Sequence, residues 1–257
     1  MVEVSNFFKE IKKHPDRFYL IHYSSQGLFD EGLDGMSPKI TSIVVMHYAT
    51  GQTVSFAVHT EAETLGIPRD QVAVRYNEIE LQLLTRFYNF ARDRRERNWV
   101  HWNMRNIVYG FEHLEHRYRL LTGLEPPSIP VEVRLNLNDA LKVRYGPDYA
   151  GDPRMRTLML LNGPLSPQFL SGAEEAEAFR NGEYVRLNSS TISKVQFFQW
   201  LIKRALIGKL RTAGKSFANL VDRVLESRAA RMWALAGTSL GVLLGLYNIV
   251  KLLLSAL

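Results

Sequence analysis

The feature that most constrains this chain is its apolar C-terminal segment 232–257, MWALAGTSLGVLLGLYNIVKLLLSAL. Met232–Val250 is a run of 19 residues without a charge. As a helix, such a run is roughly 28 Å long, close to the thickness of a bilayer's hydrocarbon core. Lys251 follows near the far end, where a long side chain can reach the interface. The segment predicts a single transmembrane helix; the alternative is a buried core helix, which usually carries a polar face.

The stretch before this segment is strongly basic, which predicts the orientation of the span. Between residues 194 and 231, nine cations stand against Asp222 and Glu226: Lys194, Lys203, Arg204, Lys209, Arg211, Lys215, Arg223, Arg228 and Arg231. Because an excess of Lys and Arg stays on the cytoplasmic side, we expect a cytoplasmic N-terminal part and a C-terminus across the membrane. Attraction to anionic lipid headgroups also explains such a stretch, so it does not by itself indicate nucleic-acid binding.

Small residues recur at a spacing of four within the predicted span. Gly237, Gly241 and Gly245 fall on one face of the helix, where they allow two helix backbones to approach closely. This pattern predicts a homo-oligomer formed through the transmembrane helix. Glycine is also common in transmembrane helices in general, so the alternative is that the spacing is incidental.

Composition sets broad limits on the remaining chain. Its 257 residues suffice for one medium domain with an appendage, and much of the net charge of +6 lies in the basic linker. The absence of cysteine excludes disulfides, thiol chemistry and cysteine-type zinc sites. The N-terminal stretch 1–15, MVEVSNFFKEIKKHP, has no apolar core, so no secretory signal is expected.

Hydrophobic periodicity predicts a mixture of strands and helices. Strands are expected at 18–23, 39–50, 53–60, 99–103 and 131–137. Helices are expected at 5–13, 78–97, 107–121, 139–145, 172–181 and 190–210, and a Gly- and Pro-marked connection runs to Gly163. This order favours a three-layer α/β domain with a mixed sheet. The expected organisation is an N-terminal helix at 1–15, the α/β domain at 16–210, a basic linker helix at 211–231 and the transmembrane helix at 232–257.

Three segments carry a family resemblance. FYLIHYSSQGLFDE (18–31), followed by SPKITSIVVMHYATGQTVSF (37–56), is similar to a first catalytic strand and its hairpin. VHWNMRNIVYGFEHLEHR (100–117) is similar to a second motif, an Asn-containing strand end before a helix that closes with L-x-x-R. GEYVRLNSSTISKV (182–195) is similar to a third, a YxxxD-V helix. Together they resemble the DEDD 3′–5′ exonucleases, and the resemblance implies a ribonuclease H-like fold over most of residues 16–210.

The chemistry of that family needs four carboxylates that hold two metal ions. In this chain the first-motif acids fall on His22 and Ser24, and the second-motif acid falls near Val108 or Gly110. The Tyr and Asp of the third motif fall on Ser190 and Lys194. The resemblance thus implies degenerate motif positions without a catalytic residue, metal or cofactor: His22, Ser24, Asn103, Val108, Gly110, Ser190 and Lys194.

Several side chains around these motifs are candidate nucleic-acid contacts. An aromatic ring beside an amide and a cation, as in Trp102, Asn103 and Arg105, can stack a base and hold a phosphate. Arg117 closes the L-x-x-R pattern, and Lys194 places a cation where a metal ligand belongs. The alternative is structural: Trp102 packs in the core and Asn103 caps the next helix.

Other patterns allow functional readings with simpler alternatives. His113 and His116, with His101, resemble part of a zinc site, and solvated histidines are the alternative. Ser24 and Ser25 beside His22 lack the G-x-S-x-G context of a hydrolase. The four arginines of 92–97 fit a nucleic-acid patch, or a solvated helix end that the helix dipole favours.

These observations favour a membrane-anchored, catalytically inactive exonuclease-like domain that binds a nucleic acid, a nucleotide or a partner protein. One alternative is a membrane-disrupting effector whose transmembrane helices oligomerise on activation, by analogy with bacterial antiphage defence. A second alternative is an active metal-dependent nuclease with relocated ligands.

Overall fold

The computed structural model describes residues 2–27, 37–105 and 109–213. The predicted transmembrane helix with Gly237, Gly241 and Gly245, almost all of the basic linker, and Val108 lie outside the described residues. The chain divides into two units, Met1–Arg211 and Thr212–Leu257, and the elements below belong to the first. None of the helices within the described ranges is both long and apolar enough to cross a bilayer.

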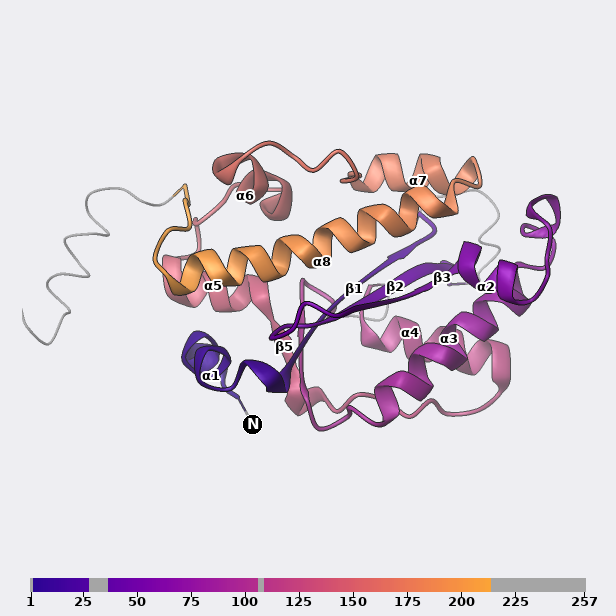
Figure 1. Cartoon of the computed structure of the whole chain (residues 1–257), viewed down its shortest axis with the longest axis horizontal. Coiled ribbons are helices and arrows are strands. Elements are labelled where there is room, and N and C mark those ends of the chain that lie inside the picture. Colours follow the sequence, from indigo (N-terminus) through magenta and orange to yellow (C-terminus); the bar gives the residue numbers. More distant parts are fainter. Residues whose placement is uncertain (1, 28–36, 106–108, 214–257) are drawn as a thin grey trace, which may run out of the picture. The chain divides into compact units, whose positions relative to one another are not determined.

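The centre of the first unit is a mixed five-stranded sheet (Figure 1). Its strands are β1 (Phe18–Ser25), β2 (Ile40–His47), β3 (Thr53–Ala57), β4 (Asn98–His101) and β5 (Arg134–Asn136). Their order across the sheet is β3-β2-β1-β4-β5. The pairs β1/β2 and β2/β3 are antiparallel, whereas β1/β4 and β4/β5 are parallel. The predicted α/β class with a mixed sheet is therefore confirmed.

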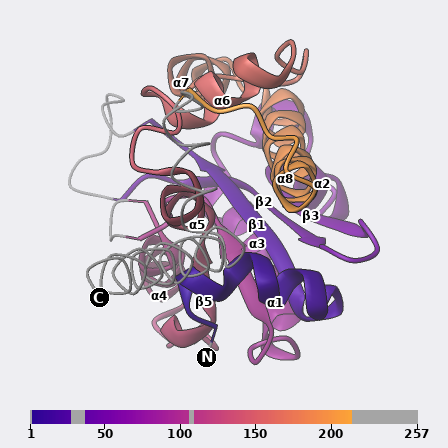
Figure 2. The ribbon, with the colours of Figure 1, turned by 90° about the vertical axis from the view of Figure 1, so that its left-hand side faces the viewer.

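Helices cover both faces of the sheet. They are α1 (Phe7–Lys13), α2 (Val58–Thr64), α3 (Tyr76–Arg92), α4 (Phe111–Thr122), α5 (Leu137–Tyr145), α6 (Arg154–Asn162), α7 (Gly172–Arg180) and α8 (Tyr184–Leu206). One hydrophobic core joins α1, α5 and α8 to the first face, and a second joins α2, α3 and α4 to the other. Figures 1 and 2 show α8 and α3 on opposite sides of the strands.

The alternation of side chains along β1 explains these two cores. Phe18 and Leu20 point to the α8 side, whereas Ile21 and Tyr23 point to the side of α3 and α4. Successive residues of a strand face opposite ways, so a strand covered on both sides needs apolar residues at nearly every position. β1 has this pattern, because it is the central strand.

The face of α8 that packs on the sheet changes from polar to apolar along its length. Its second half contributes Val195, Phe198 and Leu201 to the core. In its first half, Asn188 accepts a hydrogen bond from Ser55 Oγ (2.6 Å), and Thr191 Oγ1 lies 2.8 Å from Ser42 Oγ. Buried polar groups require such partners. The polar half of α8 therefore lies over a polar part of the sheet.

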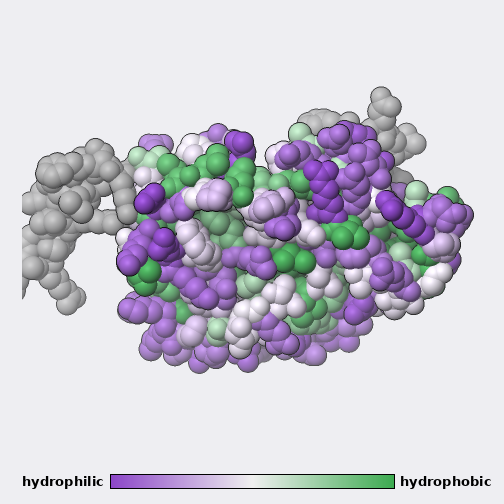
Figure 3. Space-filling model, turned by 45° about the horizontal axis from the view of Figure 1, so that its top comes forward, coloured by the Kyte–Doolittle hydropathy of each residue, from purple (hydrophilic) through white to green (hydrophobic). Residues whose placement is uncertain are grey.

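Figure 3 shows the face that carries α6, α7 and α8, where the surface over α7 is mainly hydrophilic and hydrophobic surface gathers nearer α6. Ser171 and Glu174 form a capping box at the start of α7. A hollow of about 390 Å³ between α6 and α8 is lined in part by Met159, Phe197 and Trp200.

The structure corrects several predicted elements. The strand predicted at 53–60 ends at Ala57, and α2 begins at Val58 and packs on α3 instead of continuing along the sheet. The predicted connection up to Gly163 contains α6, which Pro153 precedes and Gly163 follows. The final helix begins at Tyr184 rather than Ser190, and the helix predicted from Ile107 begins at Phe111.

Candidate functional site

The candidate site lies at the carboxyl ends of the parallel strands β1, β4 and β5. From β1 the chain adds β2 and then β3 on one side of the sheet, whereas β4 and β5 are added on the other side of β1. The strand order therefore reverses between β1 and β4. Open α/β sheets usually bind ligands at such a switch point, outside the carboxyl ends of their strands. Most of the degenerate motif residues lie on the elements that meet here.

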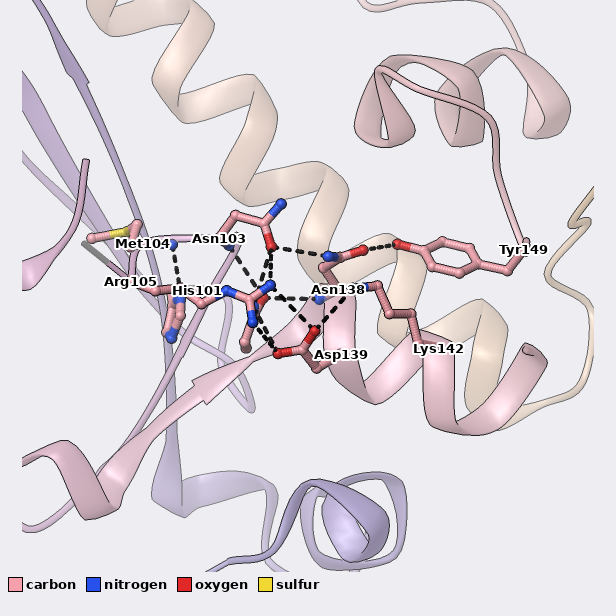
Figure 4. A network of polar contacts seen from close by, with 9 residues as sticks. His101, Asn103, Met104, Arg105, Asn138, Asp139, Lys142 and Tyr149 are labelled. Carbon is pink, nitrogen blue, oxygen red and sulfur yellow. Dashed lines mark hydrogen bonds and ion pairs between the residues drawn. The ribbon is translucent and has the colours of Figure 1, made fainter. Parts of the chain in front are cut away.

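Asn103 is the centre of a polar network at this edge (Figure 4). It follows β4 with a φ of 53°, and it is the one non-glycine residue with a positive φ among the described residues. Asparagine tolerates this left-handed conformation better than most residues. Its Oδ1 accepts hydrogen bonds from Asn136 Nδ2 (3.2 Å), Asn138 Nδ2 (2.9 Å) and Arg105 NH2 (3.2 Å). The acceptor side of the amide is thus fully used inside the network.

The partners of Asn103 are themselves fixed by the start of α5. Asn136 is the N-cap, and its Oδ1 accepts from the backbone N–H groups of Asn138 and Asn103, both at 3.1 Å. Tyr149 donates its hydroxyl proton to Asn138 Oδ1. An N-cap amide that also bonds a neighbouring strand end links α5 to β4. The side chain of Asn103 is therefore held by two elements.

The outer part of the network carries charge. Asp139 Oδ2 accepts from Arg105 NH1 at 2.8 Å, and Lys142 Nζ lies 3.4 Å from Asp139 Oδ1. Arg105 is 48% exposed in its side chain. Asn103 is exposed too, and its Nδ2 has no hydrogen-bond partner among the described residues. The edge therefore presents an amide donor and two cations against one carboxylate.

His101 supports this edge from below. Met104 donates its backbone N–H to His101 Nδ1 at 3.1 Å, and the imidazole lies edge-on to Phe111 at 5.4 Å between ring centroids. Burial, reinforced by the positive charges of Arg105 and Arg134, lowers the pKa of His101 to about 3. The imidazole is therefore neutral near pH 7 and acts as a hydrogen-bond acceptor for the turn after β4.

The two first-motif positions, His22 and Ser24, lie on the face of β1 that packs against α8. The ring of His22 lies edge-on to Phe198 at 5.6 Å, and Tyr109 Oη is 3.2 Å from His22 Nδ1. Burial, followed by the charges of Lys194 and His101, lowers the pKa of His22 well below its ordinary value. Ser24 Oγ is buried and has no hydrogen-bond partner among the described residues.

Trp102 belongs to the core in this structure. Only 6% of it is exposed, and its ring stacks on Phe198 with centroids 6.0 Å apart. It therefore has no free face on which a base could stack, which corrects the predicted role of Trp102 as a nucleic-acid contact. Asn103 and Arg105, by contrast, are exposed beside it.

The third-motif residues form a buried ion pair with α7. Lys194 Nζ lies 2.6 Å from Glu175 Oε1, and the two side chains are 7% and 16% exposed. Ser190 Oγ donates to the same carboxylate oxygen at 3.0 Å. The ammonium of Lys194 is thus neutralised by Glu175, which the sequence did not point to because α7 reads simply as an acidic surface helix.

The predicted role of Arg117 as a nucleic-acid contact is also corrected, because its guanidinium lies in the core. Both Arg117 and Glu80 are nearly fully buried, and Nε and NH2 of Arg117 donate to the two carboxylate oxygens of Glu80. NH1 donates to the carbonyl oxygen of Ser37 at 3.1 Å. Each nitrogen of the guanidinium therefore has a protein partner, and its burial keeps it away from a nucleic-acid phosphate.

The donor set of the described residues does not fit a pair of divalent ions. No group of three or more His, Asp or Glu side chains in metal-binding geometry occurs among the described residues. The carboxylate next to the third-motif positions, Glu175, already accepts hydrogen bonds from Lys194 and Ser190. His113 does not fit the predicted zinc site either, because both of its ring nitrogens already have protein partners. They contact Tyr23 Oη and the carbonyl oxygen of Pro38, both at 2.9 Å.

The charges of Lys194 and His101 act on His22, so the structure brings these three side chains together, and it buries Trp102 and Arg117 away from the surface. Asn136, Asn138 and Asp139 were missed, although the segment LNLND after a short strand is an N-cap signal. Comparisons with protein-family models, curated proteins and solved structures return no match for this chain.

Proposed function

We propose that residues 16–210 form a ribonuclease H-like domain that resembles the DEDD exonucleases, does not cleave, and binds a nucleic acid or nucleotide at the carboxyl edge of its sheet. Segment 232–257 anchors it in a membrane from the cytoplasmic side. A mixed sheet with helices on both faces is compatible with this proposal.

The observation that carries the proposal is the ion pair between Lys194 and Glu175. Two-metal cleavage of a phosphodiester needs several carboxylates free to hold the ions. Here a motif position carries an ammonium, and a carboxylate beside it is already neutralised. His22 and Ser24 at the first motif supply no anionic oxygen either. These residues favour a domain that keeps the shape of a nuclease without its chemistry.

Ligand binding is supported by the rigid network around Asn103. The amide is held through its oxygen by three donors, so its Nδ2 is fixed toward solvent beside Arg105. A charged guanidinium and a pre-positioned amide are suitable donors for a phosphate or the edge of a base. A partner protein with an acidic surface is the alternative occupant of the same edge.

The test uses the full chain in detergent micelles with fluorescent single-stranded DNA and RNA. Anisotropy in EDTA measures binding, and gel analysis after incubation with Mg²⁺ or Mn²⁺ measures cleavage. We expect salt-dependent binding, weakened by Arg105→Glu, without shortening of the strand. No binding of either strand would shift the assignment to a protein partner, and metal-dependent cleavage would support the active nuclease.

A further inference from the structure

An unassigned basic groove lies at the opposite, amino edge of the sheet. Arg17 directly precedes β1, and Arg97 directly precedes β4. Since β1 and β4 run parallel, their amino ends meet at one edge. The last residue of α3, Arg92, and the connection with Arg94 and Arg95 lie at the same edge. These five arginines line a hollow of about 980 Å³.

Four of these arginines have no anionic partner among the described residues. Arg17, Arg92, Arg95 and Arg97 are exposed, and none forms an ion pair within the described part of the chain. Arg94 differs, because it donates to the carbonyl oxygen of Phe90 at 2.9 Å and lies over that residue's ring at 3.9 Å. The lining includes two acids, Asp93 and Glu96, so positive charge is in clear excess.

Solvation and the helix dipole explain only part of this cluster. The dipole favours a cation in the last turn of α3, which accounts for Arg92. Arg95 and Arg97 lie beyond the helix end, and Arg17 comes from a different element. Guanidinium groups gathered around one hollow repel each other until an anion enters it. Their planar donor sets match phosphate oxygens in a bidentate manner.

We propose that this groove, lined by Arg17, Arg92, Arg94, Arg95 and Arg97, binds the phosphate backbone of a nucleic-acid strand. Because the arginines line the walls of a hollow, a narrow nucleic-acid strand can enter it and contact them, whereas a planar bilayer surface cannot. The groove shares no residue with the Asn103 network. The eight residues of β1 separate the two edges by about 25 Å, so the two surfaces can be tested independently.

The experiment measures the affinity of the full chain, in detergent and EDTA, for a fluorescent single-stranded oligonucleotide of about 20 nucleotides. Arg95→Glu/Arg97→Glu is compared with Arg69→Glu/Arg156→Glu, which reverses two exposed arginines outside the groove that also lack ion pairs within the described residues. We expect the groove variant to bind at least about tenfold more weakly, whatever the sequence of the oligonucleotide. The slope of log affinity against log salt concentration should become less steep by about 0.7 for each lost phosphate contact. The control variant changes affinity less than about twofold. Thermal unfolding checks both variants, and Arg95→Gln/Arg97→Gln replaces the charge reversal if that variant unfolds.

The outcomes separate this inference from the proposed function. Loss of binding in the groove variant with unchanged binding in Arg105→Glu supports the groove and refutes the carboxyl edge. The reverse result overturns the groove and leaves the carboxyl edge in place. Equal weakening in the control variant overturns the groove, because only overall charge then matters. The groove variant is also tested for co-sedimentation with vesicles. If it binds the oligonucleotide normally but co-sediments less with anionic vesicles and equally with neutral ones, the nucleic-acid groove is overturned and its arginines are assigned to lipid headgroups.

Discussion

Removing the guanidinium of Arg117 should destabilise the domain strongly. In Arg117→Met, the buried carboxylate of Glu80 keeps a hydrogen bond from the backbone N–H of Ile40 (2.8 Å) and loses its charge partner. Breaking one side of a buried ion pair costs about 3–5 kcal/mol. For a domain of this size, that corresponds to a melting temperature lower by about 6–20 °C.

The loss should also depend on pH in a defined direction. Burial raises the pKa of Glu80, although Arg117 opposes this effect. An acid whose pKa is higher in the folded than in the unfolded state reduces stability as pH rises, because the unfolded chain releases the proton first. Without Arg117 the folded-state pKa rises further. The deficit of Arg117→Met is therefore larger at about pH 7.5 than at about pH 5.

Urea unfolding followed by circular dichroism, on the full chain in detergent, measures both effects. The double variant Arg117→Met/Glu80→Gln should recover most of the loss, because the amide oxygen still accepts from Ile40 and no charge remains buried. Oligonucleotide binding well below the melting temperature should be unchanged in the single variant. An unchanged melting temperature, or equal instability of the single and double variants, would refute a buried structural role for this pair.

Three further predictions concern the site and the anchor. Lys194→Glu sets a second carboxylate beside Glu175 and should lower the melting temperature, whereas Lys194→Arg keeps the ion pair and is mild; equal melting temperatures of the two variants would contradict a structural role for this pair. Burial lowers the folded-state pKa of His101 to about 3, whereas the unfolded imidazole takes up a proton below about pH 6.5, so the free energy of unfolding falls as the pH drops below about 6.5. In His101→Gln the free energy of unfolding, measured against pH, should fall less steeply over this range than in the unmodified protein. Deleting 232–257 should release the protein from membranes, and equal membrane fractionation of the truncated and full-length proteins contradicts the anchor. Gly241→Ile should leave the protein in the membrane but reduce cross-linking between copies, since close backbone packing drives helix association in bilayers. If overexpression is toxic and Gly241→Ile relieves that toxicity, the effector alternative is favoured.

Much of the fold followed from local pattern. β1 and α3 were predicted close to their observed positions because one is almost continuously apolar and the other has a clear helical period. α2 was missed because Val58 and Thr60 favour strands, and only packing on α3 decides the helix. α6 was missed although Pro153 and Gly163, which flank it, are the usual residues at helix starts and ends.

The site was less predictable, because its chemistry depends on partners far apart in the sequence. The exposed positions of Asn103 and Arg105 agree with their predicted placement at a strand end. The buried states of Arg117 and Trp102 depend on Glu80 and Phe198, which no local motif connects to them. The compensation of Lys194 by Glu175 depends on α7 folding back over α8. A cation in a motif indicates an anion nearby, and the sequence alone does not say whether that anion is a ligand or a carboxylate of the chain.

Whether the domain binds a strand without cleaving it is tested by the length of one labelled strand bound to the full chain. The protein is incubated with end-labelled single-stranded DNA or RNA in Mn²⁺, bound material is recovered, and the length of the strand is read on a denaturing gel. We expect recovery of an intact strand in a salt-dependent complex. Progressive shortening from the 3′ end that disappears in Glu175→Gln or Asp139→Asn would contradict it, because those carboxylates would then serve metal chemistry rather than the ion pairs with Lys194 and Arg105.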